Sequence, residues 1–268
     1  MTEAQPAAAR DSITFIGTAT TLIRLGGFTI LTDPNFLHRG QRAYLGKGLW
    51  SKRRTEPSMQ PTQLPKLDAV VLSHLHGDHF DRVARRGLDK SVPIITTGHA
   101  QRHLSKWGFT AHGLTNWEGY ELHREDGESL TVESLPAIHA RGVMGRLLPP
   151  VMGSLLVHRS NGEIRQRVYL TGDTFTGGHL DAIHARHPEV DVAVVHLGGT
   201  RVLLHTVTMD APQGVDFLRR IQPRTAIPVH YDDYPVFRSP LSQFLSAARD
   251  AGFGPALRVP ARGETLTL

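Results

Sequence analysis

Apolar and polar residues alternate in three short runs near the start of the chain. The runs are SITFIGT (12–18), TTLIRLGG (20–27) and FTILTDP (28–34), and glycine or proline closes each of them. Segments rich in Ile, Thr, Leu and Phe between such breakers are typical of β-strands joined by tight turns. Residues 12–34 therefore predict an antiparallel meander.

After residue 66 the pattern alternates between strands and helices. The strand-like segments are 68–74, 92–97, 119–124, 129–138, 153–160, 163–171, 190–199 and 224–231. The segments with helical periodicity are 78–88, 99–109, 178–187, 211–222 and 240–252. This order is typical of an α/β fold, and two sheets sandwiched between helices suit it. DAVVLSH and DVAVVHL, each an Asp, an apolar run and a histidine, repeat one element in the two halves.

The organisation along the chain favours one domain. Residues 1–12 have the composition of a flexible tail, and no linker divides residues 13–268. The stretch 35–66 contains three prolines and no sustained period, which is long for a connector inside a compact domain. We expect this stretch to border a functional site, and whether it acts as a lid is open.

Composition excludes several classes of protein. The N-terminus lacks a basic start followed by an apolar core, and no apolar run is long enough to span a bilayer, so we expect a soluble, cytoplasmic protein. The chain has no cysteine, which removes disulfides, thiolate ligands and cysteine nucleophiles. Any metal must therefore be held by His, Asp or Glu. The oligomeric state cannot be inferred.

The charge balance weakly favours an anionic partner. The formal net charge is +5 and most of the basic residues are arginine, which suits contact with phosphate or carboxylate. The densest basic group is KGLWSKRRTE, in the stretch 35–66. A solvated surface is the more frequent meaning of so short a basic run, and no nucleic-acid motif accompanies it. Nucleic acid is not an expected partner.

Ligand-type side chains are concentrated in SHLHGDH. His74 and His76 are two positions apart, so both imidazoles can point to one side of an extended segment, and Asp78 and His79 follow at once. Neutral imidazole and carboxylate are the ligands that zinc-type ions prefer. Isolated surface His or Asp residues are common, but this constellation favours a metal site.

This motif is similar to the signature of the metallo-β-lactamase-fold hydrolases. Other motifs of that superfamily are present in order, each after an apolar run: LTDP with Asp33, PAIHARG with His139, YLTGDT with Asp173 and IPVHY with His230. The resemblance extends from residue 13 to the C-terminus and implies an α/β fold of the αββα type, a sandwich of two mixed sheets flanked by helices. Redox di-iron members carry a glutamate where His76 stands, which disfavours oxidoreductase chemistry.

The resemblance implies two divalent metal ions, Zn²⁺ first and Mn²⁺ or Fe²⁺ as alternatives. His74, His76 and His139 would hold one ion, Asp78, His79 and His230 the other, and Asp173 would bridge them. A hydroxide between the ions would then attack an ester, lactone or phosphodiester bond. Asp78 and Asp173 would thus act in catalysis as ligands. A non-catalytic metal- or ligand-binding protein on the same scaffold is the alternative.

Four further residues carry open alternatives. Asp33 either orients a ligand imidazole or forms an Asp-Pro turn, and His196 lines the pocket or packs at a strand end. His205 is a candidate for positioning substrate or protonating a leaving group, with a structural role favoured. The hydroxyl of Tyr231 could donate a hydrogen bond to an oxyanion, or its ring could pack at the edge of the sheet.

Within the superfamily the chain looks closest to the branch of ascorbate-phosphate lactonases and N-acyl phosphatidylethanolamine phospholipase D-like enzymes. Those substrates share a phosphate, which points to an anionic small molecule or lipid-like substrate. Four basic residues of the stretch 35–66 are the candidates for holding the anion: Arg42, Lys52, Arg53 and Arg54. The segment 141–152 matches neither subgroup, and its apolar part could line a pocket for an acyl chain or lactone ring.

Overall fold

The computed structural model describes residues 10–46, 48–140, 148–202 and 205–268, without the side chains of residues 202 and 205. The helices are α1 Arg82–Gly87, α2 Gly98–Lys106, α4 Gly178–Arg186, α5 Ala211–Ile221 and α6 Leu241–Asp250. The strands are β1 Ser12–Gly17, β2 Thr20–Leu25, β3 Phe28–Thr32, β4 Arg42–Tyr44, β5 Trp50–Lys52, β6 Ala69–Val71, β7 Ile94–Thr97, β8 Ala111–Leu114, β9 Gly119–His123, β10 Glu128–Pro136, β11 Met152–Ser160, β12 Glu163–Leu170, β13 Val192–His196, β14 Arg201–Val202, β15 His205–Thr206, β16 Thr225–Val229 and β17 Thr265–Thr267.

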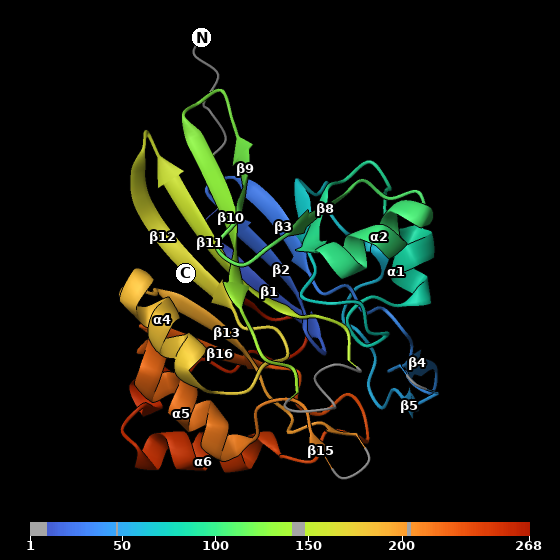
Figure 1. Cartoon of the computed structure of the whole chain (residues 1–268), viewed down its shortest axis with the longest axis vertical. Coiled ribbons are helices and arrows are strands. Elements are labelled where there is room, and N and C mark those ends of the chain that lie inside the picture. Colours follow the sequence, from blue (N-terminus) through green and yellow to red (C-terminus); the bar gives the residue numbers. More distant parts are fainter. Residues whose placement is uncertain (1–9, 47, 141–147, 203–204) are drawn as a thin grey trace.

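Two mixed sheets form the centre of the molecule (Figure 1). The first has the strand order β17-β1-β2-β3-β6-β7-β8, with the predicted antiparallel meander β1–β2–β3 and parallel pairing from β3 to β8. The second has the order β16-β13-β12-β11-β10-β9, antiparallel from β9 to β12 and parallel from β12 to β16. The predicted strand-helix alternation thus corresponds to the parallel part of each sheet.

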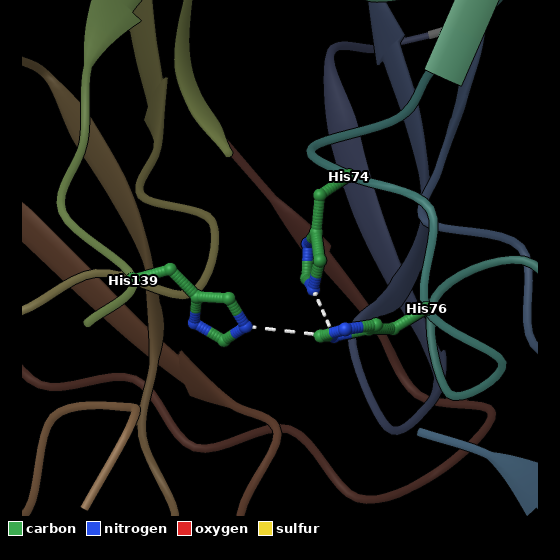
Figure 2. A group of neighbouring side chains, drawn as sticks. All are labelled: His74, His76 and His139. Carbon is green, nitrogen blue, oxygen red and sulfur yellow. Dashed lines mark hydrogen bonds between the residues drawn. The ribbon is translucent and has the colours of Figure 1, made fainter. Parts of the chain in front are cut away.

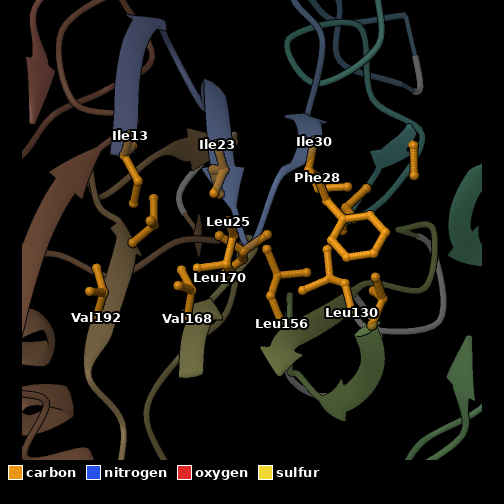
Figure 3. Close-up of a cluster of buried hydrophobic side chains, with 14 of the residues drawn as sticks. Ile13, Ile23, Leu25, Phe28, Ile30, Leu130, Leu156, Val168, Leu170 and Val192 are labelled. Carbon is orange, nitrogen blue, oxygen red and sulfur yellow. The ribbon is translucent and has the colours of Figure 1, made fainter. Parts of the chain in front are cut away.

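The central strands are buried on both faces, which explains their nearly continuous apolar sequences. In the meander, Phe15 and Ile23 face the second sheet, whereas Ile16 and Leu22 face the layer of α1 and α2. Figure 3 shows the first of these contacts, where side chains of β1–β3 meet those of β11–β13. The outer face of the second sheet packs against α4, α5 and α6. The four layers confirm the predicted αββα sandwich.

The structure also contains elements that the hydrophobic pattern did not indicate. The stretch 35–66 includes the short hairpin β4–β5, and β8 and β17 extend the first sheet. The first predicted helix starts later than expected, because Asp81 is its N-cap and accepts hydrogen bonds from Val83 N and Ala84 N at 2.7 and 2.8 Å. Asp78 and His79 therefore lie in the turn before α1.

Two segments with sequence-based predictions, the N-terminal tail and residues 141–152, lie mostly outside the described residues. Residues 1–9 are the part of the proposed tail without a description, although Ser12 already pairs with Arg24 in the first sheet. Among the described residues, no helix combines the length and apolar character that crossing a membrane requires.

Candidate metal centre

The predicted ligand residues lie at or just beyond the C-terminal ends of strands from both sheets. Asp33 follows β3, His74 follows β6, His139 follows β10, Asp173 follows β12, His196 ends β13 and His230 follows β16. Because all these strands end at the same edge of the sandwich, residues up to 197 positions apart in the chain meet there. Such edges are the usual sites of ligand binding in open α/β sheets.

Three imidazoles form the first group of this cluster. His74 and His76 come from the segment after β6 and His139 comes from the other sheet, and Figure 2 shows the three rings converging. His74 Nε2 lies 2.9 Å from His76 Nδ1, and His139 Nε2 lies 3.4 Å from the same atom. Two nitrogen ligands of a tetrahedral zinc ion are about 3.3 Å apart. The separations suit a shared cation.

The second group contains Asp78, His79 and His230. His230 Nε2 lies 3.4 Å from Asp78 Oδ2. Asp173 stands between the two groups, since its Oδ2 is 3.3 Å from His79 Nε2 and 4.0 Å from His74 Nε2. One carboxylate therefore contacts an imidazole of each group.

The outer nitrogens of the imidazoles are held by neighbouring groups. His139 Nδ1 is 2.9 Å from the carbonyl oxygen of Val207, and His230 Nδ1 is 3.2 Å from that of Leu197. A carbonyl can only accept, so each Nδ1 carries a proton, and each Nε2 is the nitrogen that faces the cluster. Metal-bound histidines are oriented in this way in many proteins.

Asp33 is buried beneath the cluster and does not face its centre. Its Oδ1 accepts hydrogen bonds from the backbone N and the Oγ of Ser73 at 2.8 and 3.0 Å. Its Oδ2 lies 3.3 Å from His79 Nδ1 and 3.2 Å from His196 Nε2. Asp33 has a φ of 37°, a strained conformation for a residue with a side chain. Ser73, which the sequence reasoning did not single out, also lies 3.0 Å from His74 Nδ1.

The ionisation of the cluster follows from burial and mutual contacts. Burial lowers the pKa of His74, His76 and His139, to about 3 for His76, so these three imidazoles are neutral near pH 7. Burial also disfavours protonation of His79 and His230, but the neighbouring carboxylates together outweigh it and raise the pKa of both: Asp173 and Asp78 act on each ring, and Asp33 acts on His79 as well. A metal ion would replace those protons.

Two buried carboxylate oxygens of the cluster lack a hydrogen-bonding partner among the described residues. Asp78 Oδ1 and Asp173 Oδ1 make no hydrogen bond within the described part of the chain, and His79 Nε2 and His230 Nε2 face the other carboxylate oxygens at 3.3 and 3.4 Å. Unsatisfied buried polar atoms are costly, and an unplaced ion is one of the usual reasons for them. Carboxylate and imidazole donors of this kind fit divalent ions such as zinc.

A small cavity adjoins both groups. It is lined by His76, Asp78, His139 and Asp173 together with Leu45, Leu148, Thr200 and Val207. Leu45 belongs to the turn between β4 and β5, and Gly77 N donates to Tyr44 O at 2.8 Å. The stretch 35–66 thus borders the site, as its length suggested.

Two other candidates are placed differently. The ring of Tyr231 packs against Phe15, with 6.1 Å between ring centroids, and contacts the apolar clusters on both sides of the second sheet. Burial raises its pKa to about 12. The structure therefore favours the packing alternative for Tyr231. The backbone of His205 pairs with Val202 in the β14–β15 hairpin, and its side chain lies outside the described residues.

The prediction that Arg53 binds a substrate anion is wrong. Its side chain is fully buried, and its guanidinium donates to Asn35 O and Asn35 Oδ1 at 2.8 and 2.7 Å and to Asp233 Oδ1 at 3.3 Å. The local sequence SKRRTE could not reveal this buried ion pair, because the partner Asp233 is 180 residues away in the chain. Arg42, Lys52 and Arg54 are exposed.

The fold and the His/Asp cluster define a metallo-β-lactamase-fold hydrolase. A family model described as the beta-lactamase superfamily domain matches residues 29–231, and the chain belongs to this family.

Relatives and a solved structure agree with this class. The chain is 28% identical over 260 residues to a UPF0173 metal-dependent hydrolase of Opitutus terrae, covering 95% of this chain and 98% of the relative. It is 28% identical over 237 residues to N-acyl-phosphatidylethanolamine-hydrolyzing phospholipase D 1 of Caenorhabditis elegans, covering 83% of this chain but 64% of that protein. The crystal structure of a possible metal-dependent hydrolase from Veillonella parvula matches with a TM-score of 0.82 at 21% identity, covering 97% of this chain and 100% of the other.

Proposed function

We propose that the chain is a dinuclear metal-dependent hydrolase that cleaves an ester, lactone or phosphodiester bond in an anionic small molecule or lipid. One observation carries the proposal. Two groups of three buried or half-buried His and Asp side chains lie on either side of Asp173, and the buried oxygens Asp78 Oδ1 and Asp173 Oδ1 have no hydrogen-bonding partner within the described residues.

The donor atoms of the seven His and Asp residues form two sets, one for each proposed ion. His74 Nε2, His76 Nδ1 and His139 Nε2 would hold the first, since they converge and are neutral. Asp78, His79 and His230 would hold the second, and Asp173 would contribute to both. Zn²⁺ is the first candidate, and Mn²⁺ or Fe²⁺ also suits a site without thiolates.

Two divalent ions held in this way would supply a water of lowered pKa and would polarise the bond to be cleaved. The chain's own residues determine where that chemistry occurs. Asp33 fixes the ring of His79 through Nδ1, and the carbonyl groups of Val207 and Leu197 fix His139 and His230. Leu45, from the stretch 35–66, presents an apolar side chain to the cavity beside the cluster and limits the access of bulk water.

The substrate proposal has two supports. The Caenorhabditis elegans relative is named for the hydrolysis of a phospholipid, and exposed arginines surround the cavity beside His76. Both favour an anionic group in the substrate.

The test is metal-dependent turnover by the full-length protein. Zinc-loaded protein is assayed with 4-nitrophenyl acetate, a γ-lactone and bis(4-nitrophenyl) phosphate. At least one should be hydrolysed, and a chelator should abolish the activity until metal is restored. His74→Ala should lower kcat/KM at least about 100-fold, because an ion would lose a ligand.

The matched control is His123→Ala, which removes an imidazole that is 66% exposed and lies outside the cluster. This variant should keep its activity. A zinc-loaded wild-type protein that hydrolyses none of the three compounds would favour the non-catalytic alternative, a metal-binding protein on the same scaffold.

A further inference from the structure

A second and larger cavity, of about 420 Å³, opens beside the ligand residue His76. It lies between the β4–β5 hairpin, α1 and α2, on the right of Figure 1. Its volume is within the range of small-molecule sites in proteins. The cavity shares the lining residue His76 with the small cavity at the metal cluster, so a molecule bound in it lies next to the candidate reaction site.

Arginine side chains border this cavity without acidic partners. Arg42, Arg82 and Arg85 line it and are exposed, and none of them makes an ion pair with Asp or Glu within the described residues. The carboxylate in the lining is Asp81, whose two oxygens already accept hydrogen bonds from five donors. Its oxygens are therefore occupied and do not pair with the guanidinium groups, and three arginines against one carboxylate leave the rim with an excess of positive charge.

Two of the three guanidinium groups are held in place by the protein. Arg82 donates to the carbonyl oxygen of Arg42 at 3.0 Å, and the guanidinium of Arg85 lies 4.1 Å from the ring centroid of Trp107. Contacts of this kind fix the side chains and leave other N–H groups free for a ligand. Positioning before binding lowers the entropy that binding would otherwise cost.

Apolar and aromatic side chains form the walls. Tyr44 and Trp50 contact each other on the hairpin with 4.9 Å between ring centroids and their planes tilted by 50°, and Phe80 and Trp107 line the cavity from the α1 and α2 side. Tyr44 and Trp50 are 46% and 57% exposed, which is unusual for large aromatic residues unless they serve a contact.

We propose that this cavity binds the part of the substrate that carries an apolar ring or chain and an anionic group, with the anion at Arg82 and Arg85 and the apolar part between the hairpin and Trp107. This deepens the proposed function by naming the substrate class and its subsite. Anion recognition is thereby assigned to Arg82 and Arg85 of α1 instead of to Arg53.

The experiment measures binding rather than turnover. Metal-loaded, full-length protein is titrated with 2-naphthalenesulfonate by calorimetry, in parallel with neutral 2-naphthol and with methanesulfonate, which lacks the ring. A sulfonate is a weak metal ligand, and this probe has no bond that the proposed hydrolysis cleaves. The probe should bind at least about tenfold more tightly than either analogue, because only it engages both the walls and the rim.

Two variants locate the binding. The double variant Arg82→Gln/Arg85→Gln should bind 2-naphthalenesulfonate about tenfold or more weakly, while its affinity for 2-naphthol should be unchanged. Arg102→Gln is the matched control: Arg102 is exposed on α2 but does not line the cavity, so its loss should change the affinity less than about twofold. Trp50→Ala should weaken the binding of both aromatic compounds, 2-naphthalenesulfonate and 2-naphthol.

Equal affinities in the Arg82→Gln/Arg85→Gln and Arg102→Gln variants would overturn the proposal, as would equal binding of 2-naphthalenesulfonate and 2-naphthol. The two proposals fail separately. Loss of metal-dependent turnover with intact 2-naphthalenesulfonate binding would refute the hydrolase, whereas turnover without this binding pattern would refute the subsite alone.

Discussion

Replacing Arg53 by alanine should destabilise the fold rather than weaken substrate binding. The guanidinium connects Asn35 in the stretch 35–66 to Asp233, three residues after the ligand His230. The side chains of Arg53 and Asp233 are both 0% exposed. Removing Arg53 therefore leaves a buried carboxylate with fewer donors and leaves a cavity beside it.

The magnitude follows from what Asp233 retains. Breaking a buried ion pair by removing one partner costs about 3–5 kcal/mol. Asp233 Oδ2 keeps Arg262 at 3.2 Å and the backbone N of Thr18 at 2.9 Å, so the lower end applies, about 3 kcal/mol. At about 2–4 °C per kcal/mol for a chain of this size, the melting temperature should fall by about 6–12 °C.

The assay is thermal and urea unfolding of the metal-loaded protein, compared with Arg54→Ala. Arg54 is the next residue and is exposed, so its replacement should change the free energy of unfolding by less than about 0.5 kcal/mol. The reasoning is refuted if Arg53→Ala lowers the melting temperature by less than about 2 °C. It is also refuted if that variant remains stable while kcat/KM falls only for anionic substrates.

Three further changes test the cluster and its support. Asp173→Asn should lower both metal content and turnover with little change in unfolding temperature, and near-wild-type activity would rule out the shared role. Asp33→Asn should weaken metal binding about 10–100-fold in a chelator competition, and unchanged affinity would contradict its orienting role. Burial raises the pKa of Asp233, but Arg262, Arg53 and the hydroxyl of Thr55 together outweigh it and hold this pKa below its ordinary 3.8. The stabilisation from Asp233 is therefore complete above about pH 5 and is lost as the pH falls further. Asp233→Asn should therefore flatten the acid-induced fall in melting temperature, and an unchanged slope would count against this.

The sequence predicted the layers and most strands, because buried strands and amphipathic helices leave strong periodic patterns. It could not predict the β4–β5 hairpin, whose two strands have three residues each, too few to define a period. SHLHGDH concentrates four polar ligand-type residues after an apolar run, so it could be recognised locally. The other motifs needed the resemblance to connect them.

Tertiary partners explain what the sequence analysis missed. Arg53 looked like part of a basic surface until the fold brought Asp233 to it. The cavity beside His76 combines the hairpin with residues of α1 and α2, and no local pattern indicates that these segments meet. One signal was present: the helix that contains Arg82 and Arg85 has no acidic residue between Arg82 and Gly87.

The number of metal ions per chain tests the proposed centre most directly. Full-length protein is stripped with a chelator, reloaded with excess Zn²⁺, freed of unbound metal and measured by mass spectrometry of the metal against protein concentration. Seven donors with Asp173 between two groups predict saturation at about two ions per chain. Saturation at one ion would contradict the dinuclear centre.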